Sequence, residues 1–477
     1  MEEDISNEDV LDYLGRLRGA SITSPHMCTA SDGRPCHILD QIPACNRLLR
    51  ANECWLEERT PDKLSLVSEP TDEESSATEA EQQHACDLIY WLLKLHRCVN
   101  TVEVRIHRDS ELFRKPTELI VKSLRTAPAL KKLRITLVSC SITKIQFLSS
   151  ISFLTQLETL ECTLINSPEI GSLLRPLFET SMALSSLNLL LSCGAVSYGH
   201  DFWDALSACK ALKSIRVTFM HNLPTTKDTY VPFFEYLERT TTLTSVHVML
   251  DIGNPSQWLK PVLNALHGNK GLVNVTFDWF IVKIEEAIAI ENFLTENSKI
   301  RSFALRECFF GNAGIAPCYH ANEFVSLTPL ILPWLSVLKT NRMLQQLHLN
   351  FRGFSAAECT AFLEGVAKNR HLRSVSVEDI QEYCLSLSRQ TRSNNNYRKG
   401  GILRHQRPEI LLSECEQIGH IRLQMSTPED LTWFVTAVLP NEMRHRITDF
   451  TFVLPLLDPS HKSASALAGF IEDSEDS

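Results

Sequence analysis

The cysteines and histidines near the start of the chain have the most evident potential for chemistry. His26, Cys28, Cys36, His37 and Cys45 all fall within the segment 26–45. Zinc prefers thiolate and imidazole ligands, but its ligands are usually paired two to four residues apart, and these residues are mostly spaced more widely. None of the chain's 15 cysteines forms a C-x-x-C pair. The pattern therefore favours reduced thiols packed in a core, and we expect no bound metal.

Catalytic motifs give no positive indication of an enzyme. The sequence His107-Arg108-Asp109 is similar to the start of a protein-kinase catalytic loop, which needs an asparagine five residues after the aspartate. Here that position holds Arg114. The patterns G-x-x-x-x-G-K-[ST], H-E-x-x-H and G-x-S-x-G do not occur in the sequence. We therefore expect no catalytic residues and no cofactor.

Composition narrows the classes of partner. The 477 residues carry a formal net charge of -10, whereas a general nucleic-acid binder usually presents a basic face. No apolar run follows Met1, and no stretch approaches 18 uninterrupted apolar residues. We expect a cytoplasmic protein with no membrane span and no nucleic-acid partner, and the sequence leaves its oligomeric state open.

An internal repeat dominates the chain. The pattern apolar-x-x-apolar-x-apolar recurs, and nine of the eleven steps between successive copies are 27 to 31 residues long. The copies begin at Val99, Leu130, Leu157, Leu184, Leu212, Leu243, Leu272, Ile300, Leu344 and Leu372, with weaker copies at Ile418 and Ile447. Another apolar residue lies six positions before almost every copy, as Leu93 does before Val99 and Leu412 before Ile418. A fixed offset of this kind indicates that a helix ends, a short turn follows and a strand begins in every unit.

One unit of about 28 residues buries too little apolar surface to fold alone, so the units must stack. The repeat predicts an α/β solenoid of about 12 units. Its parallel strands would form the concave face of a curved horseshoe, and its helices would form the convex face.

The segments "NRMLQQLHL" and "NRHLRSVSV" carry a resemblance to a known family. The pattern resembles leucine-rich repeats of the ribonuclease-inhibitor type, and in particular the repeat region of NOD-like receptors such as the arthropod NLR family CARD domain-containing-like proteins. The resemblance covers about residues 87–454. It implies protein recognition, in innate immune or regulatory processes. It does not extend to a sensor ATPase, because the nucleotide-binding motif is missing.

The chain divides into four predicted segments. Residues 1–68 form an N-terminal capping or adaptor segment, with a helical pattern that includes "CNRLLRANECWLEE". Residues 69–86 are an acidic linker that we expect to be disordered. Residues 87–457 form the repeat array, with insertions near 311–329 and 384–410, and residues 458–477 form an acidic flexible tail. The basic part of the second insertion, 388–407, could dock an acidic partner or RNA phosphates, although a solvated loop is the simpler interpretation.

Side chains between the core positions of each strand should point to the concave face. The residues that we predict to bind a partner protein there are Lys132, Arg134, Glu161, Arg216, His247, Trp279 and His348. We also expect reversal of Arg134 and Arg216 to glutamate to leave folding nearly intact. The predicted function is a non-enzymatic protein–protein interaction scaffold. The alternatives are a substrate-recognition subunit of a ubiquitin ligase, recruited through residues 1–68, and, less favoured, an enzyme or GTPase regulator that uses a concave-face arginine.

Overall fold

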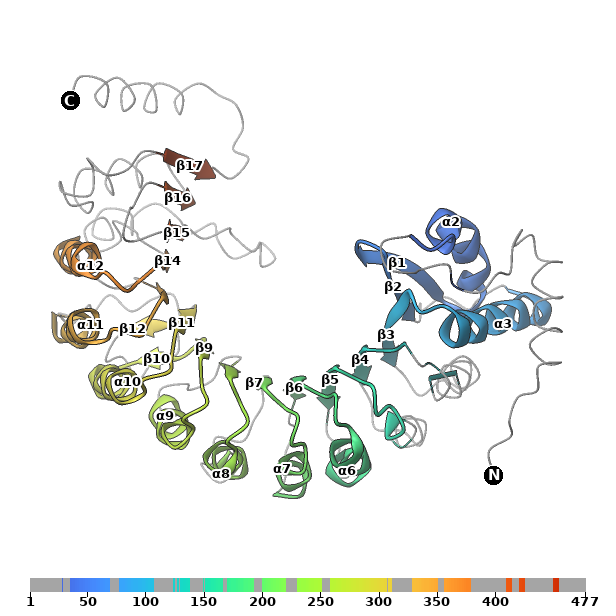
Figure 1. Cartoon of the computed structure of the whole chain (residues 1–477), viewed down its shortest axis with the longest axis horizontal. Helices are drawn as coiled ribbons and strands as arrows, with labels where there is room; N and C mark the ends of the chain where they lie inside the picture. The colour runs from blue at the N-terminus through green and yellow to red at the C-terminus, as the bar shows by residue number, and fades with distance from the viewer. Residues whose placement is uncertain are drawn as a thin grey trace, which may run out of the picture. The chain divides into compact units, whose positions relative to one another are not determined.

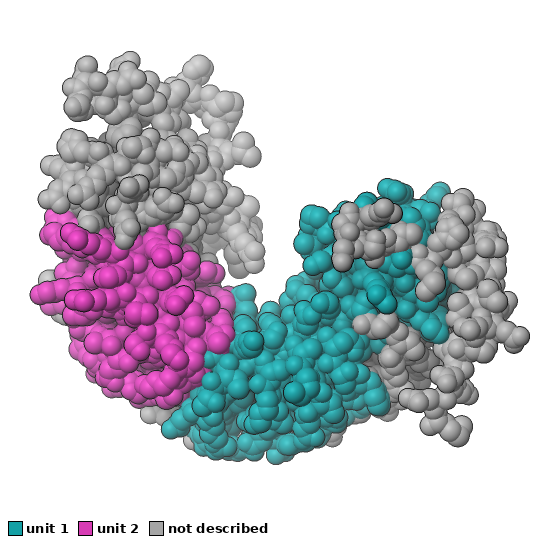
Figure 2. Space-filling view, viewed as in Figure 1, with its two compact units in different colours: residues 1–243 teal, residues 244–477 magenta. Residues whose placement is uncertain are grey.

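The computed structural model divides the chain into two compact units, residues 1–243 and 244–477 (Figure 2). The residues that it describes are 28, 35–68, 77–106, 123–124, 127, 129–137, 149, 151–165, 170–192, 200–219, 230–250, 258–306, 308–310, 328–350, 356–378, 409–413, 420–424 and 449–453.

Unit 1 begins with a helix and a hairpin and continues as alternating strands and helices. Its strands are β1 (Cys54–Thr60), β2 (Lys63–Ser68), β3 (Val99–Ile106), β4 (Lys132–Leu137), β5 (Thr159–Ile165), β6 (Ser186–Ser192) and β7 (Ser214–Phe219). Its helices are α2 (Ile38–Leu49), the 3-10 turn η1 (Arg50–Asn52), α3 (Glu79–Leu95), α6 (Ile170–Thr180), α7 (His200–Ser207) and α8 (Val231–Arg239).

The strands of unit 1 lie in one sheet in sequence order, from β1 to β7. β1 and β2 pair antiparallel, and the pairs from β2 to β7 are parallel. α6 packs against α7, and α7 against α8, along one side of the sheet (Figure 1). These helices leave the opposite face of the strands uncovered (Figure 1).

Unit 2 continues the alternation of strand and helix. Its strands are β8 (Ser245–Leu250), β9 (Asn274–Asp278), β10 (Ile281–Val282), β11 (Ser302–Arg306), β12 (Phe309–Phe310), β13 (Gln346–Asn350), β14 (Ser374–Glu378), β15 (Glu409–Ser413), β16 (His420–Gln424) and β17 (Asp449–Val453). Its helices are α9 (Leu259–His267), α10 (Ile284–Glu296), α11 (Thr328–Thr340) and α12 (Ala356–Lys368). The sheet order is β8-β9-β11-β13-β14-β15-β16-β17, while β10 and β12 form a separate parallel pair.

The structure confirms the α/β class, the alternation of strands and helices, and a mostly parallel sheet. Each of the twelve copies of the pattern coincides with a strand. In the first ten copies, the three apolar positions are buried wherever the side chain is described. Leu133 and Ile135 of β4, for example, are both 0% exposed. Full burial of such a side chain stabilises the fold by about 1.5–3 kcal/mol, so the repeat pattern marks the core correctly.

At two junctions between helix and strand an asparagine, Asn341 or Asn369, joins neighbouring repeats. In Asn341, which follows α11, Oδ1 accepts hydrogen bonds from the backbone N–H groups of Met343 and Leu344 at 2.8 and 2.9 Å. Its Nδ2 donates to the carbonyl of Leu294, in the preceding helix, at 2.6 Å. Asn369 makes the equivalent three bonds after α12. One side chain therefore closes the turn of its own repeat and joins it to the repeat before.

Three predicted elements differ from the structure. The helical pattern of residues 45–58 ends at Leu49, and β1 follows, because Glu53 takes a left-handed conformation with φ 54° that breaks the helix. The expected linker 69–86 overlaps α3, which begins at Glu79 behind a capping box between Thr78 and Glu81. Leu412, expected to end a helix, instead lies in β15, which pairs antiparallel with both β14 and β16.

Several predictions fall outside the described residues. They include the His107-Arg108-Asp109 sequence, the basic segment 388–407, most of the insertion 311–329, and the tail 458–477.

Candidate interaction surface

The sheet register of unit 1 aligns five side chains across five neighbouring strands. Their Cα atoms pair in the order Glu103, Arg134, Glu161, Asn188 and Arg216, from β3 to β7. We call this set the polar row. Adjacent strands are about 4.8 Å apart, so the row is about 19 Å long. In each strand the residues directly before and after the row member are buried against the helices. Because side chains alternate along a strand, the row lies on the opposite face of the sheet.

Glu103 is the electrostatic centre of one end of this row. Its side chain is only 1% exposed, and three guanidinium groups surround its carboxylate. Nη2 of Arg59 and Nη2 of Arg105 each lie 2.9 Å from a carboxylate oxygen, and Nη1 of Arg134 lies 3.1 Å away. Arg59 belongs to β1, so the cluster connects the N-terminal hairpin to the first two strands of the repeat.

The charge state of Glu103 follows from this arrangement. Burial alone would raise the pKa of its carboxyl group, but the hydrogen bonds from Arg105 and the charges of Arg134 and Arg59 outweigh burial and hold the pKa below its usual value. A buried carboxylate with three cationic partners is ionised and fully paired. Glu103 is therefore a structural residue rather than a free binding group.

Arg134 connects Glu103 to the next acidic residue of the row. Its Nε donates to Oε2 of Glu161, whose other oxygen lies 2.6 Å from Nζ of Lys132. Burial would lower the pKa of Arg134 and raise that of Glu161, but their mutual ion pair and the contacts with Glu103 and Lys132 reverse both shifts. Because Arg134 is ion-paired on both sides, we now expect its reversal to glutamate to destabilise the fold, in contrast to the expectation from the sequence. A glutamate there would be the third carboxylate in one cluster.

Arg216 lies at the other end of the row and has a different environment. Its side chain is exposed, and within the part of the chain that the structure describes no ion pair involves it. Asn188, between Glu161 and Arg216, is half-buried. The row therefore changes from a cluster of mutually paired charges at β3–β5 to an arginine at β7 that has no ion-pair partner among the described residues. Arg216 is thus the member most available to an acidic partner.

The remaining predicted residues belong to unit 2. Nε2 of His247 in β8 lies 2.7 Å from Oδ2 of Asp278 in β9, and the two side chains are 17% and 9% exposed. Trp279 follows Asp278 in a left-handed conformation with φ 67°, and its backbone N–H donates to the carbonyl of Arg306. His348 lies on β13 in register with Ala304. His247 thus lies on β8 and Trp279 directly follows the neighbouring strand β9, whereas His348 lies two strands beyond β9 in the sheet.

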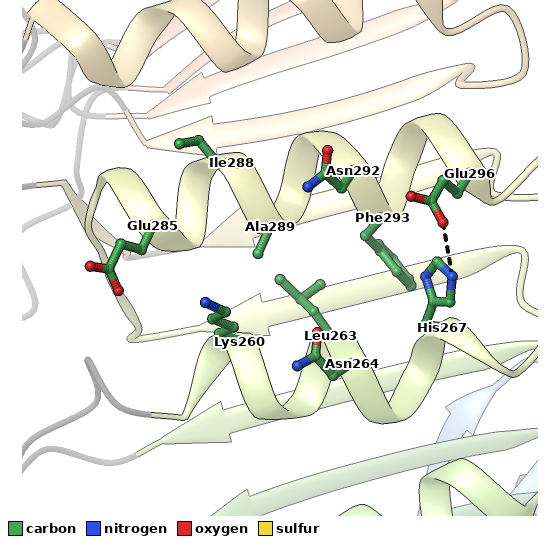
Figure 3. Close-up of a pocket in the computed structure, with 10 residues that line it drawn as sticks. All are labelled: Lys260, Leu263, Asn264, His267, Glu285, Ile288, Ala289, Asn292, Phe293 and Glu296. Atoms are coloured by element: carbon green, nitrogen blue, oxygen red, sulfur yellow. Dashed lines mark ion pairs between the residues drawn. The ribbon is translucent and has the colours of Figure 1, made fainter.

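A shallow hollow lies on the helix side of unit 2, between α9 and α10 (Figure 3). Its volume is about 490 Å³, and an ion pair of 2.9 Å between His267 and Glu296 closes one end. Ile288 on its rim is 45% exposed. Figure 3 shows its polar side chains spread along two helices without converging on a point. The hollow is a groove between packed helices and carries no argument for catalysis.

A compact group of possible metal ligands lies at the N-terminal end of unit 1. It consists of Cys28, Cys36, His96 and Cys98, and we call it the Cys3His cluster. Two members, Cys28 and Cys36, are in the set considered from the sequence, and His96 and Cys98 were missed. The latter two lie 60 or more residues further along the chain, so spacing could not reveal them. Hydrogen bonding to Cys36, together with burial, raises the pKa of the Cys98 thiol.

Comparison of the sequence with models of known protein families and with curated proteins finds no match. Among the helices that the structure describes, none has both the length and the apolar composition needed to cross a bilayer.

Proposed function

We propose that this chain is a leucine-rich-repeat solenoid of the ribonuclease-inhibitor type. In this proposal it acts inside the cell as a non-enzymatic scaffold, in innate immune or regulatory recognition, that binds a partner protein on the strand face. The polar row is the observation that carries the proposal. It presents Glu103, Arg134, Glu161, Asn188 and Arg216 on five adjacent strands in register. Extended strand faces of repeat proteins are suited to binding other macromolecules.

The two ends of the polar row have different roles in the proposed recognition. The charged side chains around Glu103 are already held in ion pairs with one another, so this cluster serves to fix the shape of the face. Arg216 is exposed and offers both a charge and a planar hydrogen-bonding group, which makes it the preferred anchor for an acidic partner. Reversing an interface charge of this kind lowers the association rate and the affinity through lost electrostatic complementarity.

The ubiquitin-ligase alternative requires residues 1–68 to be available for a second partner. α2 packs against both β1 and α3, and β2 extends the sheet by pairing with β3. These contacts favour the capping interpretation, because an uncovered end of a repeat array exposes its core.

Affinity capture with the full-length chain tests the proposal. The Arg216→Glu variant should lose the partner while keeping its folded stability, because exposed substitutions usually cost within about 0.5 kcal/mol. The matched control is Lys210→Glu, a charge reversal in the turn after α7 and outside the strands, which should retain the partner. Deleting residues 388–407 tests the alternative that the basic segment binds the partner. If that deletion alone abolishes capture, the basic segment is the binding site and the strand face is not.

A further inference from the structure

The Cys3His cluster brings four side chains to one point. The ligand atoms of Cys28, Cys36, His96 and Cys98 all lie within 4.8 Å of one another. The Sγ atoms of Cys28 and Cys36 are 3.7 Å apart, and Nδ1 of His96 is 3.4 Å from Sγ of Cys36 and 3.9 Å from Sγ of Cys98. Three sulfurs and one nitrogen therefore lie close enough together to surround one small ion.

The three distances of 3.4, 3.7 and 3.9 Å are close to the separations between ligands of one zinc ion. Zinc binds thiolate sulfur at about 2.3 Å and imidazole nitrogen at about 2.0–2.1 Å, and a tetrahedron with those arms has edges of about 3.8 Å between sulfurs and about 3.6 Å between sulfur and nitrogen. We propose that Cys28, Cys36, His96 and Cys98 bind one zinc ion, and that this ion fastens the part of the chain that carries Cys28 and Cys36 to the first repeat.

The local environment favours a metal over four ordinary core residues. Cys36 and His96 are each 1% exposed, and Cys98 is 3% exposed. The hydrogen-bond-range neighbours of the His96 ring are the sulfurs of Cys36 and Cys98, which are weak partners for a buried imidazole. The ring of Trp91 covers His96 at 4.1 Å between centroids. Cys28 is half-buried. Soft thiolates together with an imidazole are a donor set suited to zinc.

The repeat itself explains why His96 points at these thiols. His96 lies three residues before Val99, which is the position held by Asn341 and Asn369 in later copies. Those asparagines reach the backbone of the preceding helix. The first copy follows the N-terminal segment instead of another repeat, and the side chain at this position meets Cys36. A metal bond would thus take the place of the hydrogen bond that joins later repeats.

Four protein ligands complete a tetrahedral zinc site and leave no position for water or substrate, which is the arrangement of structural zinc sites. Cys28 and Cys36 precede α2, whereas His96 directly follows α3 and Cys98 directly precedes β3. The ion would therefore tie together two segments whose ligands Cys36 and His96 are separated by 60 residues. Because an unfolded chain holds no preformed site, the binding free energy would add to the stability of this end of unit 1.

Metal analysis of the purified full-length chain tests the proposal. After expression in zinc-supplemented medium and desalting, elemental mass spectrometry should find one zinc per chain. Cys36→Ser and Cys98→Ser should lose the zinc. His96→Asn should lose it as well, whereas His96→Cys should keep it because a thiolate replaces the imidazole.

Two control variants replace residues of the Cys/His segment 26–45 that lie outside the Cys3His cluster. His37 has its Nδ1 4.0 Å from Sγ of Cys36, and Cys45 is a buried thiol in α2 outside the cluster. His37→Asn and Cys45→Ser should both retain one zinc. Loss of zinc in these two variants with retention in Cys98→Ser would overturn the assignment.

Measurements on the unmutated chain keep the proposal testable if the ligand variants do not fold. Replacing zinc with Co²⁺ should produce the visible absorption of a tetrahedral cobalt site with thiolate charge-transfer bands, and a chelator should lower the melting temperature. A chain that binds neither metal would overturn the proposal. So would peptide mapping that finds a disulfide between Cys28 and Cys36 in freshly purified protein, because those sulfurs would no longer be ligands.

Discussion

Replacing Glu103 with glutamine probes the polar row at its most buried point. The change keeps the shape of the side chain and removes one negative charge from the centre of three guanidinium groups. The new amide can still accept a hydrogen bond from Arg105 through its oxygen. Its nitrogen, however, would direct N–H donors at Arg134 or Arg59, where the carboxylate accepts at 3.1 and 2.9 Å.

The structure indicates the magnitude of the loss. Hydrogen bonds to a charged group contribute about 1.5–3 kcal/mol each, and removing one partner of a buried ion pair costs about 3–5 kcal/mol. The three arginine side chains are 33–39% exposed and can turn partly to water. We therefore expect Glu103→Gln to lower the free energy of unfolding by about 2–4 kcal/mol, somewhat below the full cost of breaking a buried pair.

Urea denaturation followed by circular dichroism measures this loss. The matched control is Glu158→Gln, the same change at a glutamate that is 48% exposed and pairs with Lys131 at 2.7 Å. An exposed ion pair contributes only about 0–1 kcal/mol, so the control should shift the midpoint little. If the two variants lose the same stability, Glu103 does not hold the hairpin to the repeat as we argue.

The remaining predictions concern pH and two backbone contacts. Because the folded pKa of Glu103 lies below its unfolded value near 4.5, its contribution is complete above that pH and is lost as pH falls through the folded pKa. The stability difference between wild type and Glu103→Gln should therefore shrink in acid titrations below pH 4.5, and a constant difference would contradict the pairing. Asn369→Ala should cost about 2–4 kcal/mol in urea unfolding, because three backbone groups, two of them buried, lose their hydrogen-bond partner. Asn188→Ala should cost less than about 0.5 kcal/mol, and equal losses would contradict the role of Asn369 in joining the repeats. Gly171→Ala should cost about 1–3 kcal/mol, because a Cβ would lie 2.7 Å from the backbone of the next helix. Gly365→Ala meets only movable side-chain atoms at 3.0 Å or more and should cost less; the reverse ranking of melting temperatures would refute the helix packing.

The core could be predicted from the sequence because the same three apolar positions recur in each repeat. Cys162 and Phe277 are not leucines, yet both occupy the last apolar position of a copy, and both are buried at 2% and 0% exposure. A position that recurs with a fixed offset identifies the inward side of a strand whatever the identity of its neighbours. The same logic placed Arg134 and Arg216 on the opposite face.

The burial of polar side chains did not follow from the pattern. Arg134 and Arg216 hold equivalent positions, yet one is enclosed by two glutamates and the other is exposed. The difference depends partly on Arg59, which comes from a hairpin outside the repeat. That hairpin itself depends on left-handed conformations at Glu53 and Asp62, residues that carry no glycine signal.

The Cys3His cluster escaped sequence analysis for a related reason. His96 could have been placed by the repeat register, because it occupies the position of the later asparagines. Cys28 and Cys36 precede the repeat, so no periodicity connects them to it. Only the packing of α2 against α3 and β1 brings the two pairs of ligands together.

Site-specific photo-crosslinking tests most directly whether the strand face is the recognition surface. A photoreactive residue at position 188, in the middle of the polar row, should crosslink to the protein that Arg216→Glu loses. The same residue at position 264, in the groove on the helix side, should not form that crosslink. A crosslink at 264 with none at 188 would contradict our account and place binding on the helices.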